Sequence, residues 1–157
     1  MTKRARKYPL DELQQLYQQL TKAQSTIKTL IGALIGMALA IMAFWAVAKP
    51  IGVNLYIISL PSFFIVFIPP VMMGFFAKLY GQSYNVKPRL GVGIIALLFH
   101  IAVISLMHIH PIWYLLAPVV FGLAVYIAKI KLTRKEWIAI DMAELGKFQE
   151  LKEHEDE

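Results

Sequence analysis

Histidine is the residue type with the widest chemistry inside the apolar part of this sequence. His100 lies near the middle of the apolar stretch 90–107, and no Asp, Glu, Lys or Arg falls within any of the four apolar stretches of the chain. An ionisable side chain at membrane depth is by default a functional candidate, such as a proton relay or a ligand. The simpler alternative is a neutral imidazole that is hydrogen-bonded to a neighbouring helix. The sequence leaves both roles open.

Two further histidines, His108 and His110, stand two residues apart just before Pro111. On a helix, imidazoles at this spacing point apart, so they can share a metal only on extended backbone. Met107 would add a soft ligand for copper, but no carboxylate or cysteine lies nearby, and the ligand set is short. We therefore predict an interfacial turn, with neither a metal nor a cofactor. His100, His108 and His110 remain the candidate ligands for a metal or haem.

Other catalytic signatures are missing from the sequence. Ser59, Ser62 and Ser105 are the serines in the apolar stretches, and intramembrane hydrolysis would require one of them to pair with His100. The sequence has no nucleophile elbow, phosphate loop or dinucleotide-binding glycine pattern. The absence of cysteine excludes thiol catalysis, disulfides and iron–sulfur clusters. These observations predict that the protein is not an enzyme.

Adjacent prolines mark a weak point in the second apolar stretch. Pro69 has no N–H for the carbonyl of Ile65, and Pro70 has none for the carbonyl of Val66. We expect the helix to kink or break there. The result is either a packed kink or a discontinuous helix that lines a cavity. Pro118 is expected to act more mildly in the fourth stretch, by freeing the carbonyl of Tyr114.

The composition indicates that the histidines and prolines described above belong to a membrane protein. The chain has 157 residues, of which 58% are hydrophobic and only 17% charged, with a mean hydropathy of +0.58. A soluble domain carries about 25% charged residues, so a water-soluble globular protein is disfavoured. Helices of about 20 residues cross a bilayer. The sequence therefore predicts an all-α, polytopic membrane protein with four transmembrane helices, at approximately 30–48, 55–77, 90–107 and 112–128.

The distribution of charge predicts the orientation. The net charge is +6, and every basic residue except Lys49 falls in the N-terminal tail, the loop between spans two and three, or the C-terminal tail. The positive-inside rule places these three segments in the cytoplasm. The excess of positive charge then reflects membrane topology, and no nucleic-acid partner is expected. The predicted organisation is a helical N-tail (1–29), a transmembrane domain (30–128) and a helical C-tail (129–157).

The N-terminal tail has a heptad pattern that is continuous with the first span. No helix breaker intervenes, so we predict one long helix from about Leu10 to Ala48. The pattern favours either a coiled coil between copies or an amphipathic helix that packs on lipid or on the C-tail. The apolar heptad positions are Leu13, Leu16, Leu20, Ala23, Ile27 and Leu30.

A stripe of small residues, Gly32, Gly36 and Ala40, follows on the first span. Such a stripe lets two helices approach closely. It serves either packing within the chain or contact between two copies. Together with Leu13, Leu16, Leu20, Ala23 and Ile27, it is the predicted oligomer interface.

The C-terminal tail begins with a capping-box pattern, Thr133 with Glu136, and its helix is predicted to reach about Leu151. The chain end beyond it is acidic. The basic residues that we expect to contact anionic lipid headgroups, in preference to this acidic end, are Lys3, Arg4, Arg6 and Lys7 in the N-tail and Lys87 and Arg89 in the second loop.

One region of the chain resembles a known group of proteins. The segments Gly74–Gly81 and Arg89–Ala96 form a helix, a basic loop and a glycine-containing helix. This arrangement resembles small uncharacterised four-span bacterial inner-membrane proteins. The resemblance implies a bacterial inner membrane and brings no known activity.

The function that follows from the sequence is that of a non-enzymatic membrane accessory, scaffolding or assembly subunit. It would act through its cytoplasmic helical tails, by self-association or by binding another membrane protein. The alternative is a small oligomeric transporter or channel that uses the Pro-broken second span and His100. A membrane-embedded enzyme or haem protein is the third hypothesis.

Overall fold

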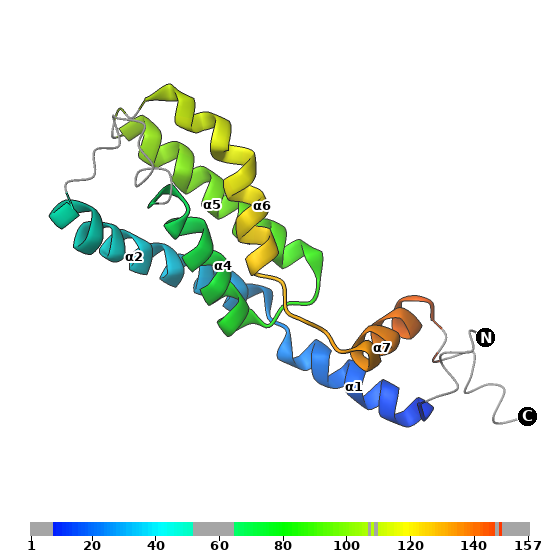
Figure 1. The fold of residues 1–157 in the computed structure, drawn as a ribbon. Helices are drawn as coiled ribbons and strands as arrows, with labels where there is room; N and C mark the ends of the chain where they lie inside the picture. Colours follow the sequence, from blue (N-terminus) through cyan, green and yellow to red (C-terminus); the bar gives the residue numbers. More distant parts are fainter. Residues whose placement is uncertain (1–7, 52–64, 107, 109, 147, 149–157) are drawn as a thin grey trace, which may run out of the picture. The chain divides into compact units, whose positions relative to one another are not determined.

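The computed structural model describes residues 8–51, 65–106, 108, 110–146 and 148, and every regular element in them is helical (Figure 1). The chain forms two compact units. The bundle unit runs from Ser25 to Ile130. The tail unit joins the residues up to Gln24 with those from Lys131 onward. The all-α class is thus confirmed for the described part of the chain.

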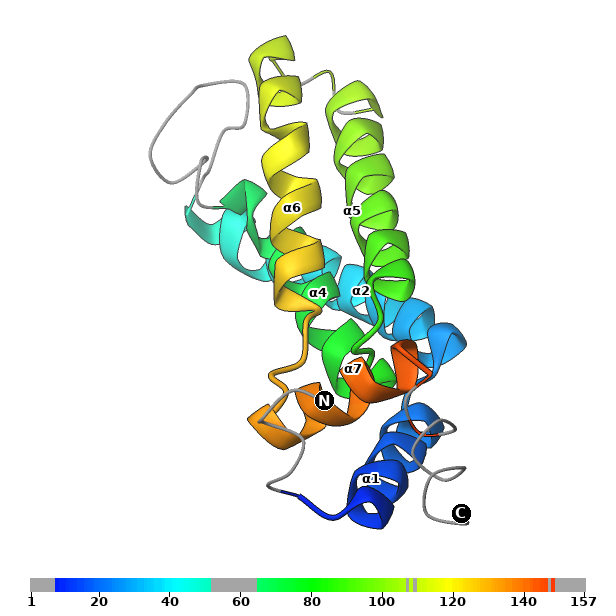
Figure 2. The ribbon, with the colours of Figure 1, turned by 90° about the vertical axis from the view of Figure 1, so that its right-hand side faces the viewer.

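In its described residues, the bundle unit contains the α-helices α2, α4, α5 and α6 and the 3₁₀-helix η2. Helix α2 packs along α4, and α5 packs against α6, which also contacts α4 (Figure 2). Small and medium apolar side chains fill the core, including Ala33, Met73, Val92, Val120 and Ala124. The elements are α2 (Thr26–Ile51), α4 (Ile68–Gly81), α5 (Val86–Leu106), the 3₁₀-helix η2 (Pro111–Leu116) and α6 (Ala117–Ile127).

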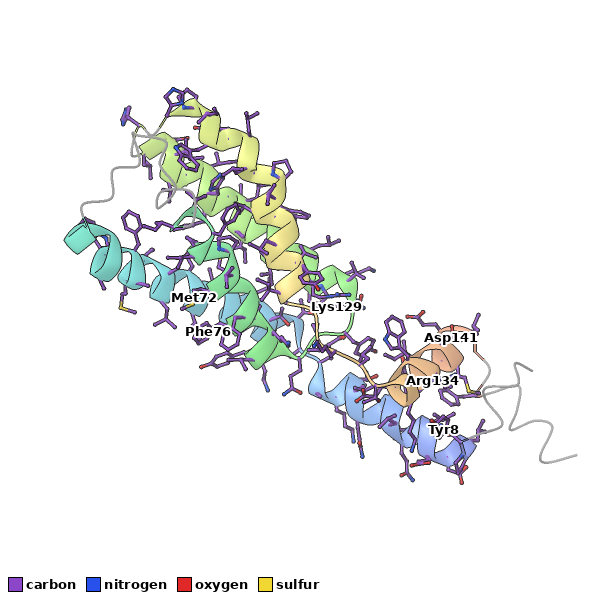
Figure 3. The ribbon with its side chains drawn as sticks, in the orientation of Figure 1. Tyr8, Met72, Phe76, Lys129, Arg134 and Asp141 are labelled. Carbon is purple, nitrogen blue, oxygen red and sulfur yellow. The ribbon has the colours of Figure 1, made fainter. Side chains whose placement is uncertain are left out.

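Two glycines allow α2 and α4 to approach closely. A Cβ atom on Gly32 would lie 2.5 Å from the carbonyl oxygen of Phe76, and one on Gly36 would lie 2.5 Å from that of Met72. Figure 3 labels Met72 and Phe76 on α4. Ala40, the third member of the stripe, is also buried. Packing within the chain, one of the two roles considered for this stripe, therefore explains its small residues.

The predicted single helix from Leu10 to Ala48 is wrong. Helix α1 ends at Ala23, Gln24 is extended, and α2 begins at Thr26. Ser25 causes the break because its hydroxyl accepts a hydrogen bond from the N–H of Lys28 at 3.3 Å, in the manner of a helix N-cap. The N–H of Ser25 itself donates to the carbonyl of Gly81 at the end of α4, at 3.1 Å.

The prolines lie in the first turns of helices. Pro69 and Pro70 follow Ile68, the first residue of α4, where the missing N–H groups interrupt no α-helical bond within α4. The earlier part of the predicted span 55–77, up to residue 64, lies outside the described residues. Pro118 likewise stands in the first turn of α6. The expectation of a free Tyr114 carbonyl is wrong, since this carbonyl accepts from the N–H of Ala117.

The tail unit consists of α1 (Leu10–Ala23) and α7 (Arg134–Glu144). Leu13 is fully buried against Ala139 and Met142, which places the heptad face of α1 on the C-tail helix. Lys135 forms an ion pair with Glu12, and its ammonium lies 5.3 Å from the centre of the Tyr8 ring. Packing on the C-tail was one of the two alternatives for this face.

The start of α7 is confirmed and its end is not. Thr133 and Glu136 form the predicted capping box. The helix stops at Glu144, short of the expected end at about Leu151. Gly146 follows with φ of 67°, the left-handed conformation that commonly terminates helices.

Within the described part of the chain, two helices are long and apolar enough to cross a membrane, Thr26–Ala46 and Val86–Leu106. The 17 residues of η2 and α6, Pro111–Ile127, form a shorter apolar segment. The starts of α2 and α5 meet the ends of α4 and α6 at one end of the bundle unit (Figure 2). The basic residues that cluster in sequence near these four helix ends are Lys28, Lys78, Lys87, Arg89 and Lys129.

Candidate functional site

A cavity of about 60 Å³ lies inside the bundle unit, between the beginning of α4, the middle of α5 and η2. A water molecule needs about 10–15 Å³ of such space, so the cavity has room for about four. Most of its wall is apolar. Its lining residues are Phe44, Ile65, Val66, Pro69, Pro70, Ala96, Phe99, His100, Val103, Ile104, Trp113 and Val120.

His100 lines this cavity and joins two elements of the fold. Its side chain is 8% exposed, and its Nε2 lies 3.0 Å from the carbonyl oxygen of Trp113. A carbonyl oxygen only accepts, so Nε2–H is the donor. In the neutral ring Nδ1 is then an acceptor. His100 therefore makes the hydrogen bond to a neighbouring helix that the sequence suggested as its simpler role.

Trp113 contributes a polar group that has no partner. The side chain is 3% exposed and packs with Val66, Val103, Ile104 and Leu116. Its indole Nε1–H is buried and makes no hydrogen bond within the described part of the chain. Buried donors of this kind are rare, because leaving one unpaired costs about 1–3 kcal/mol.

The carbonyl of Val66 is a second polar group on the cavity wall that lacks a local partner. Within a helix it would accept from the N–H three or four residues later, but those residues are Pro69 and Pro70. The carbonyl of Ile65 loses its four-residue partner to Pro69 in the same way. The two prolines that the sequence singled out thus deny these carbonyls helical partners in a segment that lines the cavity.

An apolar hollow of about 180 Å³ adjoins the cavity. Both spaces are bordered by Phe44, Pro69, Phe99 and Val103, so they lie side by side. Among the described residues that line this hollow, the indole of Trp45 is the one polar side chain. Its lining residues are Ala40, Ile41, Phe44, Trp45, Pro69, Phe99 and Val103.

His108 and His110 lie in the turn that leads into η2. His110 caps this 3₁₀-helix, because its Nδ1 accepts from the N–H of Ile112 at 3.3 Å. His108 has φ of 52°, and both side chains are exposed. No group of three or more His, Cys, Asp or Glu that could hold a metal is found within the described residues. The predicted turn is present, and its histidines do not join His100.

The basic end of the bundle unit buries one of its cations. Arg89 is 9% exposed, with Nε donating to the carbonyl of Asn85 and Nη2 to that of Tyr84, both at 3.0 Å. Lys87 is exposed. The other predicted headgroup contacts, Lys3, Arg4, Arg6 and Lys7, lie outside the described residues. Arg89 thus closes the α4–α5 loop, a role that its sequence position did not reveal.

The predicted interface residues separate into two groups. Leu13 and Leu16 belong to the core of the tail unit, while Ile27 on α2 is 71% exposed. Leu20 is half-buried and Ala23 exposed. Association between copies through these residues stays a prediction.

Sequence reasoning missed Trp113 as a site residue. It treated the tryptophan as one more apolar residue, because nothing in the sequence places an indole thirteen residues after His100 beside it. The available signal was Pro111, which starts a short helix and turns the chain back toward α5.

No family model, curated protein or solved structure matches this chain.

Proposed function

We propose that this chain is a multi-pass bacterial inner-membrane protein with four spans and both tails in the cytoplasm, and that it serves as a non-enzymatic accessory or assembly subunit. Only 28% of one candidate span and 33% of the other is buried inside the bundle. A helix from the core of a soluble protein would be mostly buried. The exposed apolar faces therefore support contact with lipid.

Charge supports the orientation. The sequence of the bundle unit, from Ser25 to Ile130, contains no Asp or Glu, and its basic residues other than Lys49 cluster near one end. Cytoplasmic ends of spans carry such an excess of Lys and Arg. Anionic lipid headgroups are the expected partner of this end, with Lys87 exposed to meet them.

The observation that carries the accessory role is the separate core of the tail unit. Leu13, Ala139 and Met142 hold α1 and α7 together, although the two helices come from opposite ends of the chain. Apolar and polar side chains are exposed on this unit, among them Trp137 at 53% and Leu145 at 54%. A small folded unit of this kind suits docking to another copy or another membrane protein.

Native mass spectrometry of gently extracted, full-length protein tests this role. Leu13→Glu places a charge in the core of the tail unit, and Gln18→Glu makes a matched change at an exposed position of the same helix. We expect L13E, like deletion of residues 1–28, to lose self-association or a bound partner while the protein still inserts into the membrane. Q18E should assemble like the wild type. Unchanged assembly of both L13E and the deletion would overturn the role.

A transporter or channel is the second candidate, and the cavity at Pro69, Pro70 and His100 favours it. Discontinuous helices with unpaired carbonyls are typical of transport sites. Flux in proteoliposomes that disappears in His100→Ala or Pro70→Ala would support this alternative. Proteoliposomes that are tight to ions and small solutes would count against it.

A further inference from the structure

The cavity at His100 and the apolar hollow beside it share four lining residues and differ in character, and together they make up a site with two different ends. The inner end is lined by Trp113, whose indole N–H is unpartnered, by Val66, whose carbonyl loses its helical partners to Pro69 and Pro70, and by His100. The outer end is bordered by aliphatic and aromatic side chains from α2, α4 and α5. The two spaces therefore suit a molecule that has a polar head at one end and an apolar tail at the other.

The polar groups at the inner end determine what kind of head fits. Trp113 offers a donor, while Val66 and Nδ1 of His100 offer acceptors. A hydroxyl group can pair with a donor and with an acceptor at the same time. Its oxygen accepts from the indole N–H, and its proton is donated to a carbonyl or to the imidazole. A charged head is disfavoured, because none of the described residues that line the two spaces carries a charged side chain.

We propose that this site binds a neutral, lipid-soluble molecule with one hydroxyl head and an alkyl chain. The hydroxyl pairs with Trp113 and with the acceptors of Val66 and His100, and the chain lies in the hollow between Ala40, Ile41, Phe99 and Val103. Binding gives the indole N–H of Trp113 a hydrogen-bond acceptor, and this hydrogen bond supplies part of the affinity. The proposal concerns binding in the bundle unit and does not depend on the role of the tail unit.

The three tryptophans of the chain make a direct test possible. Trp113 lines the inner end, Trp45 lines the hollow, and Trp137 lies on α7 in the tail unit. Full-length protein labelled with ¹⁵N-tryptophan and placed in nanodiscs gives one indole N–H signal for each, assigned by single Trp→Phe variants. The probes are 1-dodecanol and dodecane, which share the chain and differ in the hydroxyl.

We expect 1-dodecanol to shift the signals of Trp113 and Trp45 saturably and to leave that of Trp137 in place. Dodecane should leave the Trp113 signal where it is. The proposal is overturned if 1-dodecanol causes no saturable shift of Trp113. It is equally overturned if dodecane causes the same shift, because the site would then accept any acyl chain of the membrane without recognising a hydroxyl.

A matched pair of variants locates the binding. Val103→Phe fills the boundary between the two spaces, whereas Val119→Phe makes the same change at an exposed position of α6 that lines neither. We expect V103F to weaken 1-dodecanol binding roughly tenfold or more, the effect of losing about one good contact, and V119F to bind like the wild type. Equal affinity of V103F and V119F would contradict the proposed site. The comparison of the two probes on wild-type protein decides the question even where V103F does not fold.

Discussion

At the scale of single residues, the bundle unit depends on a few polar contacts within an apolar core. The hydrogen bond from His100 to the Trp113 carbonyl links α5 to η2, and Arg89 closes the α4–α5 loop. Thr29, which is 1% exposed, donates its hydroxyl proton to the Ser25 carbonyl at 2.7 Å. Most buried polar groups in proteins are paired in this way, although the hydroxyl of Ser83 and the indole of Trp113 are not paired within the described residues. This preference for pairing makes the unpaired indole of Trp113 an exception that invites a ligand.

Replacement of His100 tests how much its hydrogen bond to the Trp113 carbonyl contributes to the stability of the fold. His100→Phe keeps an aromatic ring but removes the donor to the Trp113 carbonyl, so we expect a loss of stability of about 1 kcal/mol. The measurement is thermal unfolding in detergent micelles. Tyr126→Phe is the control, because it also removes a polar group from an aromatic side chain, but one that is 76% exposed, and it should cost less. Equal melting temperatures for H100F and the wild type would show that this bond contributes nothing.

At the scale of elements, the close approach of α2 and α4 depends on the lack of side chains at Gly32 and Gly36. Gly36→Val is expected to force the two helices apart and to cost about 1–3 kcal/mol, as overpacked cores do. Gly122→Val on α6 is the matched control, since a Cβ there meets nothing within 4 Å. Thermal unfolding of the two variants measures the difference. If G36V unfolds like G122V, the close contact is not part of the fold.

The break between α1 and α2 is tested at its cap. Ser25→Ala removes the hydroxyl that accepts from Lys28 and should cost about 1 kcal/mol, whereas Ser25→Gly should cost only a few tenths. The neighbouring substitution Thr26→Ala serves as control because Thr26 is exposed. If α1 and α2 formed one continuous helix, S25A would stabilise the protein, and that result would contradict the cap. The unfolding temperatures of S25A, S25G and T26A distinguish the two cases.

The elements that could be predicted from the sequence are those whose interactions join residues close together along the chain. The helical class and the capping box at Thr133 depend on neighbours within four residues, and they could be predicted. The prolines, which were expected inside spans, lie instead in the first turns of α4 and α6. The cap at Ser25 also depends on a residue only three positions away, Lys28. It was not predicted because the heptad pattern continues through this segment and indicates an unbroken helix. The site was predicted in part: Pro69, Pro70 and His100 line it, while Trp113 joins them through a turn whose direction no local pattern specifies.

At the scale of the whole molecule, the absence of cysteine makes topology directly measurable. Single cysteines at Gln18, Asn85 and His108 report on the N-tail, the second loop and the third loop. In intact bacterial cells, a membrane-impermeant maleimide should label His108→Cys and leave Q18C and N85C unlabelled until the cells are opened. Labelling of Q18C in intact cells would contradict a cytoplasmic tail.

The placement of the cations has a consequence for proteolysis. Trypsin cleaves after Lys and Arg but not before proline, and proline follows both Lys49 and Lys87. The cleavable bonds of the bundle unit therefore all lie near the end where α2 and α5 begin and α4 and α6 end. Complete digestion would leave 29–78 and 90–129 as two uncut fragments. In the proposed orientation, a protease confined to the cytoplasm would sever the loop that joins these fragments and release both tails, while each fragment stays uncut in the bilayer.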